Sequence, residues 1–207
     1  GDLEERFGIS SAVNLGFHYK MKSNFSYGLD VQFITGDRVK NTNQILGDIT
    51  TESGPITNDG RLAVMSFAQR GMNINLKIGK VFSIGAPNNN SGIWLQAGAG
   101  YYWNKVRIST NNFDLQLLSN DFLKGYDELR AGFSTSQSLG YLYLSNKRLL
   151  NFSIAVEAIQ AYATDQRGYN YRTRSSKKES YVDHLFGLRA TWYFPLYKRS
   201  VEVYQYY

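Results

Sequence analysis

Apolar and polar side chains alternate with a period of two along most of this chain. The stretch from residue 71 to residue 82, GMNINLKIGKVF, shows it clearly, with Met72, Ile74, Leu76 and Ile78 alternating with Asn73, Asn75 and Lys77. Successive side chains of a β-strand point to opposite faces, so this period predicts a strand with one apolar and one polar face. In a soluble sandwich the apolar face packs on the core, whereas in a transmembrane barrel it faces lipid and the polar face lines the lumen.

The same alternation recurs in seven segments. They span residues 7–21, 25–33, 71–82, 92–105, 133–143, 151–158 and 185–197. Their polar faces carry mainly Gly, Ser, Asn and Ala, which suit a narrow interior. Their apolar faces carry Tyr, Trp and Phe towards the ends, as an interfacial aromatic girdle does. The pattern therefore favours a membrane barrel, and the alternative is a lipocalin-like or sandwich fold with an apolar interior.

The connections between these segments alternate between short and long. The short ones cover residues 22–24, 86–92 and 145–148, and the long ones cover roughly 41–65, 109–130 and 167–182. Outer-membrane barrels combine short periplasmic turns with long extracellular loops. A soluble meander has no reason to keep this alternation, so the connections also favour a transmembrane barrel.

Seven strands leave an antiparallel barrel one strand short. Bacterial barrels have an even number of strands, and a first segment that ends in a short turn puts Gly1 on the outer side. We therefore expect an all-β, antiparallel up-and-down transmembrane β-barrel of eight strands, with the first strand before residue 1. Residues 201–207 could instead turn back as a short strand, but seven residues at ~3.3 Å each scarcely cross a bilayer. The barrel is then expected over residues 1–199, followed by a short periplasmic tail at 200–207.

The composition is compatible with this interpretation. Of 207 residues, 15% are aromatic, 19 are Gly and 3 are Pro, a balance that suits strands better than helices. The mean hydropathy of −0.38 is weak evidence for a soluble protein, because a barrel shows only half of each strand to lipid. No apolar run approaches the ~18 residues of a transmembrane helix. Cys is absent, which excludes a disulfide framework and a thiol nucleophile.

With its strand pattern and the final stretch GLRATWYFPLYKR, the sequence resembles the small outer-membrane barrels of the OmpA and OmpX type, and more specifically those of Bacteroidota. Gly187, Trp192 and Phe194 loosely match the signal by which the barrel-assembly machinery recognises its clients. The resemblance covers nearly the whole chain and is one of pattern. It implies an integral bacterial outer-membrane protein in contact with lipid and lipopolysaccharide. It also implies an accessory subunit of a larger machine, as in type IX secretion or barrel assembly, with other outer-membrane subunits as partners.

Several charged or titratable side chains share the polar faces and are expected in the lumen: His18, Lys20, Asp30, Lys77, Glu157 and Arg189. The lumen of an eight-stranded barrel is barely wide enough for side chains, and unpaired buried charges are costly, so we expect these groups to pair. Glu157 and Arg189, on neighbouring segments at similar heights, are the best candidate pair. The interpretation that we favour is a plugged, solid barrel, and the alternative is a gated pore.

Two loops and the tail carry candidate binding residues. The apolar second long loop and the tail are expected to contact partner subunits through Leu115, Leu117, Leu118, Phe122, Val203, Tyr204 and Tyr206. The third long loop is basic and is expected to bind lipopolysaccharide phosphates or an acidic partner through Arg167, Arg172, Arg174, Lys177 and Lys178. Nucleic acid is not expected on an outer-membrane loop. The plainer alternatives are a solvated third loop and a frayed tail, and the apolar second loop could instead form a small cap on the barrel.

Little in the sequence points to catalysis. The chain has no GxGxxG after a strand, P-loop, HExxH or GxSxG motif, and with two histidines neither a metal site nor a cofactor is expected. Ser180, Asp183 and His184 are residue types that serve acyl chemistry in lipid A-modifying barrels. Asp183 and His184 would point to opposite faces of a regular strand, however, and the His-x-Ser spacing is absent. We expect a non-enzymatic barrel, with a lipid A-modifying enzyme and a free-standing pore or adhesion barrel as alternatives.

Overall fold

A computed structural model describes residues 6–40, 50–51, 54–55, 65–110, 124–146, 150–169, 175–176 and 178–196. Seven long strands form one antiparallel sheet of order β1-β2-β5-β6-β7-β8-β9. Their bounds are β1 Ser11–Lys20, β2 Phe25–Gly36, β5 Met65–Phe82, β6 Gly92–Thr110, β7 Arg130–Leu144, β8 Asn151–Asp165 and β9 Ser180–Trp192. A separate two-stranded sheet pairs β3 (Thr50–Thr51) with β4 (Gly54–Pro55). The seven strands and their up-and-down order confirm the all-β fold that the alternation predicted.

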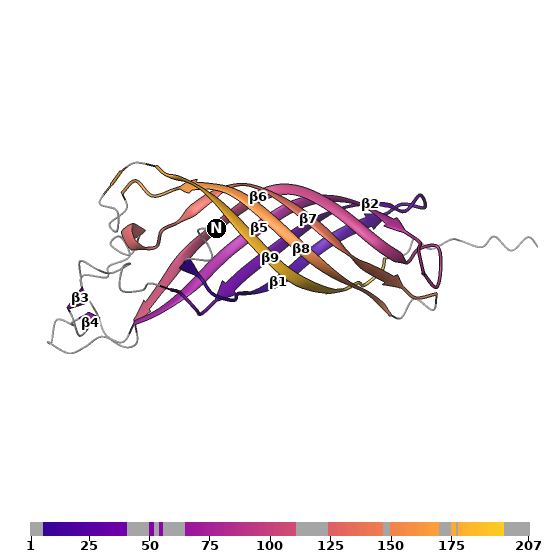
Figure 1. Ribbon diagram of the computed structural model, residues 1–207, viewed down its shortest axis with the longest axis horizontal. Helices are drawn as coiled ribbons and strands as arrows, with labels where there is room; N and C mark the ends of the chain where they lie inside the picture. The colour runs from indigo at the N-terminus through magenta and orange to yellow at the C-terminus, as the bar shows by residue number, and fades with distance from the viewer. Residues whose placement is uncertain are drawn as a thin grey trace, which may run out of the picture.

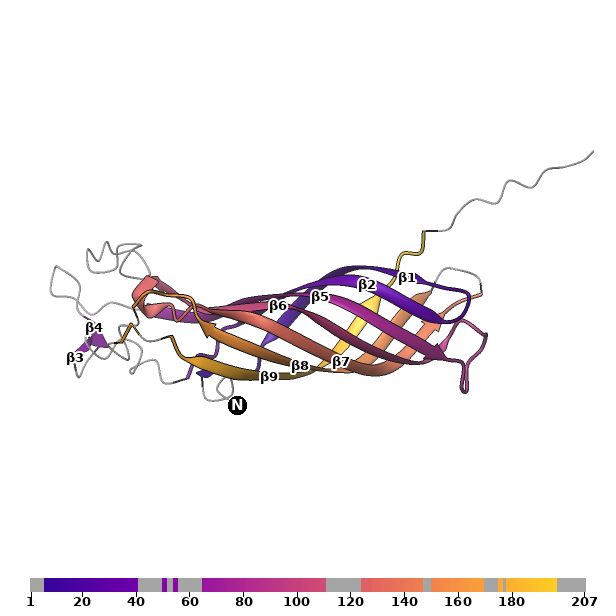
Figure 2. The same cartoon turned by 90° about the horizontal axis from the view of Figure 1, so that it is seen from above.

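The long sheet is rolled around one axis, with its strands tilted relative to that axis (Figures 1 and 2). The three short connections lie at one end, and the three long ones, including β3 and β4, lie at the other. The sheet is not closed, because no backbone pairing joins β1 to β9 among the described residues. No helix in the described part of the chain is long and apolar enough to cross a membrane.

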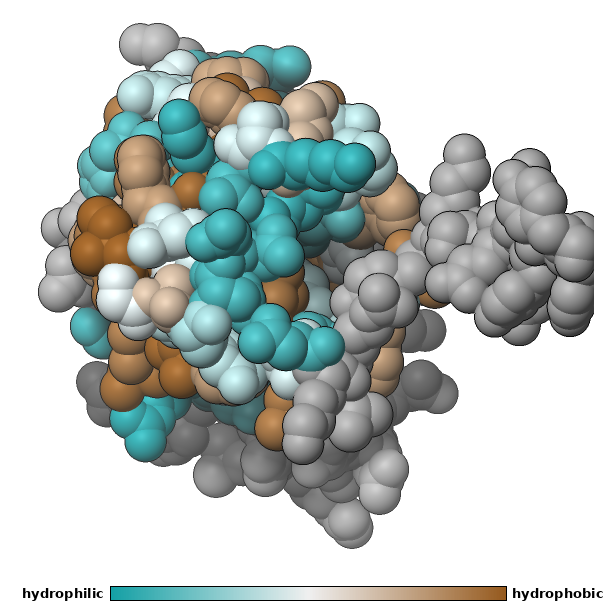
Figure 3. All heavy atoms as spheres, turned by 90° about the vertical axis from the view of Figure 1, so that its right-hand side faces the viewer, coloured by the Kyte–Doolittle hydropathy of each residue, from teal (hydrophilic) through white to brown (hydrophobic). Residues whose placement is uncertain are grey.

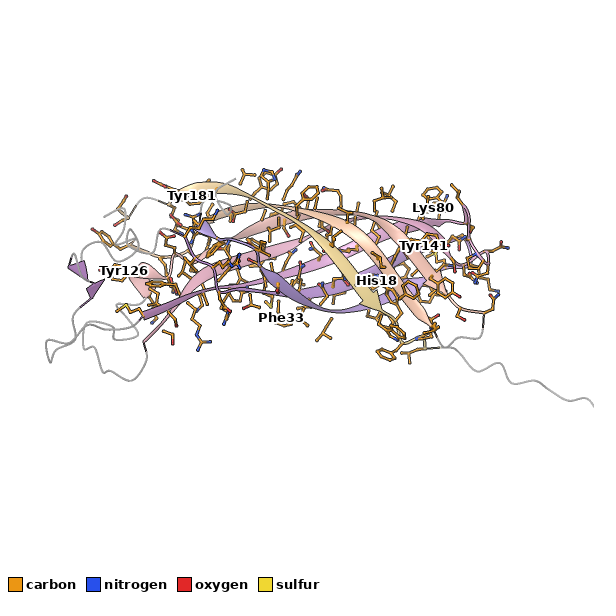
Figure 4. The ribbon with its side chains drawn as sticks, turned by 60° about the horizontal axis from the view of Figure 1, so that its bottom comes forward. His18, Phe33, Lys80, Tyr126, Tyr141 and Tyr181 are labelled. Carbon is orange, nitrogen blue, oxygen red and sulfur yellow. The ribbon has the colours of Figure 1, made fainter. Side chains whose placement is uncertain are left out.

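The polar face of the rolled sheet is inside and the apolar face is outside. On β5, Asn73 and Lys77 are 0% and 3% exposed, whereas Leu76 and Ile78 are both 69% exposed. Phe33 of β2 likewise projects from the outer surface (Figure 4). This arrangement is the inverse of a soluble sandwich. The period of two separates the two faces, and the direction in which the sheet rolls places the polar one inside.

Aromatic side chains gather on the outer surface near the short connections. Tyr19 of β1 packs on Tyr27 of β2, and Tyr143 of β7 packs on Phe152 of β8, each with ring centroids 5.2 Å apart. At the same end, the Lys80 ammonium lies 4.6 Å from the ring centroid of Phe25. Figure 3 looks onto this end, where hydrophilic residues lie in the middle of the described surface and hydrophobic ones lie towards its rim.

The start of the chain differs from the expectation that Phe7 belongs to the apolar outer face. Phe7 is only 3% exposed and packs inside, against Tyr102, Val106 and Tyr126. The reason is backbone pairing: residues 6–8 pair with residues 38–40 beyond the ends of β1 and β2, with an isolated antiparallel bridge between Phe7 and Val39. Regular β1 therefore starts at Ser11, and Phe7 fills the mouth at the end with the long connections.

Candidate functional site

Four charged side chains meet inside the rolled sheet in an alternating ring. The Oδ2 atom of Asp30 accepts a hydrogen bond from Arg189 Nη2 at 2.7 Å. The same oxygen lies 3.0 Å from Lys77 Nζ. Glu157 Oε1 accepts from Arg189 Nη1 at 3.1 Å and from Lys77 Nζ. Each carboxylate thus contacts both cations, and the four formal charges sum to zero. Such mutual pairing offsets the cost of removing charges from water.

This ring of charges, from here on the interior ring, joins strands that are not neighbours in the sheet. Lys77 on β5 reaches Glu157 on β8, and Arg189 on β9 reaches Asp30 on β2. The four side chains are between 2% and 13% exposed. The contacts cross the interior at this level, so the ring both fills the centre and holds opposite walls of the sheet together.

Residue His18 links the interior ring to an aromatic layer nearer the short connections. Its Nε2 atom lies 2.8 Å from Asp30 Oδ1, and its ring meets Trp94 and Tyr193 edge-on, at centroid distances of 5.7 and 6.2 Å. The Trp94 indole donates to Ser26 at 3.1 Å, and the Tyr193 and Ser153 hydroxyls lie 3.0 Å apart. Figure 4 shows His18 towards this end of the sheet.

On the other side of the interior ring, neutral amides and hydroxyls fill the space. Ser134 on β7 donates to Asn73 on β5 at 2.9 Å. Asn104 on β6 donates to Asp183 on β9 at 3.1 Å and to the Tyr102 hydroxyl at 3.0 Å. Sequence reasoning did not place Asp183 in the interior, although it shares the parity of Arg189 along β9. The shared parity with Arg189 could therefore have identified Asp183 as an interior residue.

The sequence predicted six interior residues, and the structure brings five of them together. Lys20 lies apart, where its ammonium donates to Asn24 at 2.6 Å and to Asn90 at 2.9 Å. Lys20 is the last residue of β1, so its long side chain reaches the amides of the neighbouring short connections. Glu157 and Arg189, the pair expected from the sequence, are in contact, but as half of the interior ring and not as an isolated pair.

Ion pairs also close the opposite mouth, where the long connections lie. Arg6 Nη2 is 2.8 Å from Glu128 Oε2, which ties the segment before β1 to the segment before β7. The Arg130 guanidinium lies 3.5 Å from the ring centroid of Tyr181, at the start of β9. Figure 4 places Tyr126 and Tyr181 at this end of the molecule. The mouth therefore joins parts of the chain that are distant in sequence.

The basic third loop is described only in part. Arg167 Nε donates to Asp127 Oδ1 at 2.9 Å and Nη2 donates to Oδ2, and this hydrogen bonding raises the Arg167 pKa above its ordinary value. The Arg167 charge is therefore engaged within the protein, which weakens its case as an anion-binding residue. Lys178 is exposed. Arg172, Arg174 and Lys177 lie outside the described residues.

The predicted partner-binding residues lie outside the described residues as well. They are Leu115, Leu117, Leu118 and Phe122 in the second long loop and Val203, Tyr204 and Tyr206 in the tail. The proposed contacts of these residues stay predictions.

Three residues considered for acyl chemistry do not converge. Asp183 is fully buried and bound to Asn104, whereas His184 and Ser180 are exposed. Asp183 and His184 therefore point to opposite faces of β9, as the period of two predicted. In the described part of the chain, no three His, Cys, Asp or Glu residues are grouped so that they could hold a metal ion.

Comparison with protein-family models, with curated proteins and with solved structures finds no match for this chain. A functional interpretation rests on the polar interior, the apolar exterior and the open edges of the sheet.

Proposed function

We propose that this protein is an eight-stranded β-barrel integral to the bacterial outer membrane, with a plugged interior. We further propose that it acts without catalysis, as a structural or accessory subunit of a larger outer-membrane complex for protein secretion or barrel assembly. The observation that carries the membrane assignment is the inversion of the two faces of the sheet. The exterior bears Leu, Ile, Phe and Tyr, while the interior bears Asn, Ser and paired charges.

The exposed apolar face has a physical explanation only in an apolar environment. Leu188, Phe186 and Leu76 are 85%, 82% and 69% exposed. Burying a side chain of this size is worth about 1.5–3 kcal/mol, and in water that gain is lost at every such position around the sheet. Strands of 13 to 19 residues in β5 to β9 are long enough to cross the ~25 Å apolar band of an outer membrane when tilted.

Strand direction supports closure by one additional strand. In an up-and-down sheet of seven strands, β1 and β9 run the same way, so they cannot pair antiparallel with each other. An eighth strand between them would run antiparallel to both and would complete an even-numbered barrel. The short connections then face the periplasm and the long ones face outward.

The interior ring supports a solid barrel rather than a pore. Its side chains meet in the middle of the interior, with the aromatic layer of His18, Trp94 and Tyr193 on one side of it. Conductance of liposomes that rises with added purified protein would contradict the plugged interior.

Tryptophan quenching by brominated lipids tests the membrane assignment. Trp192 is 53% exposed on the outer surface of β9, whereas Trp94 is 5% exposed and bonded inside. In single-Trp proteins in which the other two tryptophans are replaced by Phe, we expect brominated acyl chains to quench Trp192 strongly and Trp94 weakly. Equal quenching of the two, or no quenching of Trp192, would contradict insertion with the apolar face outward.

The subunit assignment is tested by native purification with mass spectrometry. If the expected partner elements act as proposed, removing residues 201–207 leaves a folded, heat-modifiable barrel that no longer co-purifies with its complex. Replacing Leu117, Leu118 and Phe122 with Ser should have the same effect from the outer side. If both variants keep every partner and cells without the protein secrete and assemble normally, the subunit assignment fails. Altered lipid A in such cells would instead support an enzyme.

A further inference from the structure

A long groove separates the two edges of the sheet. It is lined by β1 and β9 along most of their length and has a volume of about 1860 Å³. The groove also reaches inward to Asp30, Glu157 and Arg189, so it opens onto the interior ring. The two edges can be followed in Figure 1, where β1 and β9 bear neighbouring labels.

We infer that this groove is filled by one β-strand of the same polypeptide, formed by the segment before residue 1. This strand points a large uncharged side chain inward beside Gly16 and Gly187. The inference rests on the proposed membrane barrel and specifies its closing strand. It is carried by the direction of the edges, the lack of an edge side chain at Gly16 and Gly187, and the charge balance of the interior.

The edges require an occupant in a bilayer. Along β1 and β9 the backbone groups that face the groove have no strand partner among the described residues. Lipid offers no hydrogen bonds to such groups, so a membrane sheet with open edges is strongly unfavourable. A single strand antiparallel to both β1 and β9 pairs both edges at once.

A second copy of the chain does not meet this requirement. Copies inserted in one membrane share an orientation, so the β1 and β9 edges of all copies run the same way. Any pairing between such edges is parallel, whereas every pairing in this sheet is antiparallel. The long strands among the described residues are all already paired within the sheet.

The direction of β1 favours the chain before residue 1 as the source. Residues 6–8 continue β1 towards the end with the long connections, where Phe7 is buried in the mouth. A strand that fills the groove antiparallel to β1 ends at that same end. Joining it to β1 requires a connection like those that already join β2 to β5, β6 to β7 and β8 to β9 there.

Two glycines on the edges of the sheet indicate the size of the side chain that the missing strand carries. Gly187 faces the interior with the parity of Arg189, and a Cβ atom placed there meets nothing within 4 Å. Gly16 pairs with Asp30, whose carboxylate occupies the place of a β1 side chain. At these two positions neither edge contributes a side chain to the interior, although Arg189 of β9 enters the interior ring from two residues further along the strand. Protein interiors are close-packed, so a large side chain from the missing strand is needed to fill this space.

The same side chain must be uncharged. The two carboxylates and two cations of the interior ring already balance and contact one another. An added charge at this level is buried without an opposite partner, which is costly. The groove therefore favours a large, uncharged side chain at one inward-facing position of the strand that fills it.

Strand β8 supplies a probe, because it runs antiparallel to β9 and places residue 157 opposite Gly187. We would measure binding of a peptide of residues 152–164, with Phe, Gly or Glu at position 157, to the 207-residue protein in detergent micelles. The expected order of affinity is Phe over Gly over Glu, with Phe roughly tenfold tighter than Glu. Equal affinities, or an absence of binding, would overturn the selectivity that we infer.

Filling the space from the protein side provides the matched control. Gly187→Trp should weaken binding of the Phe peptide by roughly tenfold or more, because the indole takes the same volume. Gly168→Trp should leave binding unchanged, since Gly168 also has open space around it but lies outside the groove. Heat-modifiable mobility checks that both variants fold, and Trp192 quenching in the single-Trp protein reports insertion. Quenching without peptide selectivity would therefore defeat this inference and leave the membrane assignment intact.

The source of the strand is tested with the longer natural polypeptide. If its own preceding segment fills the groove, the Phe peptide should not bind to it. Binding as tight as that to the 207-residue protein would overturn the proposed source and point to a strand from another protein. Stronger peptide binding after removal of residues 201–207 would overturn it too, because the tail would then be the occupant.

Discussion

Replacing Asp30 with Asn should lower the free energy of unfolding by about 3–5 kcal/mol, the range for breaking a buried charge pair by neutralising one partner. Asp30 is 2% exposed and contacts Lys77, Arg189 and His18. Its loss leaves two buried cations facing Glu157 alone. The effect should be large because the excess positive charge stays inside the sheet, where the Lys77 side chain is only 2% exposed.

Urea unfolding in lipid bilayers, followed by heat-modifiable mobility, measures this change. Asp37→Asn is the matched control, because Asp37 is exposed beyond the end of β2. Adding Lys77→Met to Asp30→Asn removes the excess charge and should recover part of the loss. A single variant as stable as the wild-type protein would contradict the role of the interior ring in holding the walls together.

The alternation of side chains predicted the seven long strands and the face of most residues within them. Lys77 and Leu76 are neighbours in sequence, yet one is buried and the other is exposed, as the period of two requires. The same rule placed Asp183 and His184 on opposite sides of β9. These features depend on local geometry alone, which is why a single sequence reveals them.

The sequence was much less informative about contacts across the interior. Glu157 and Arg189 could be paired because they lie on neighbouring strands, but the link from Arg189 to Asp30 joins β9 to β2. Such a contact depends on how tightly the sheet rolls and on the offset between strands, and neither is encoded in the alternation. The contact between Asn104 and Asp183 was missed for the same reason.

Strand ends were the least predictable part of the fold. The alternation continues through Phe7, so the sequence assigned this residue to the outer face, which was wrong. Backbone pairing with residues 38–40 and packing on Tyr102 decide its position instead. Lys20 illustrates the same limit at the other end of β1, where the amides of the short connections attract its side chain.

A substitution on the outer face gives the most direct test of which side of the sheet meets lipid. Leu76→Arg should destabilise folding into bilayers by about 2–4 kcal/mol if residue 76 is near the midplane, because a guanidinium there enters hydrocarbon. Asn75→Ala, one residue away, should cost about 1 kcal/mol, since it removes an amide whose oxygen lies 3.5 Å from Ser134 Oγ. Leu76 is 69% exposed and Asn75 is 3% exposed, so a soluble protein predicts the opposite order of effects. Equilibrium folding into large vesicles, measured for both variants against the wild-type protein, separates the two cases. A greater loss at Asn75 than at Leu76 would mean that the apolar face does not meet lipid, and the proposed barrel would have to be abandoned.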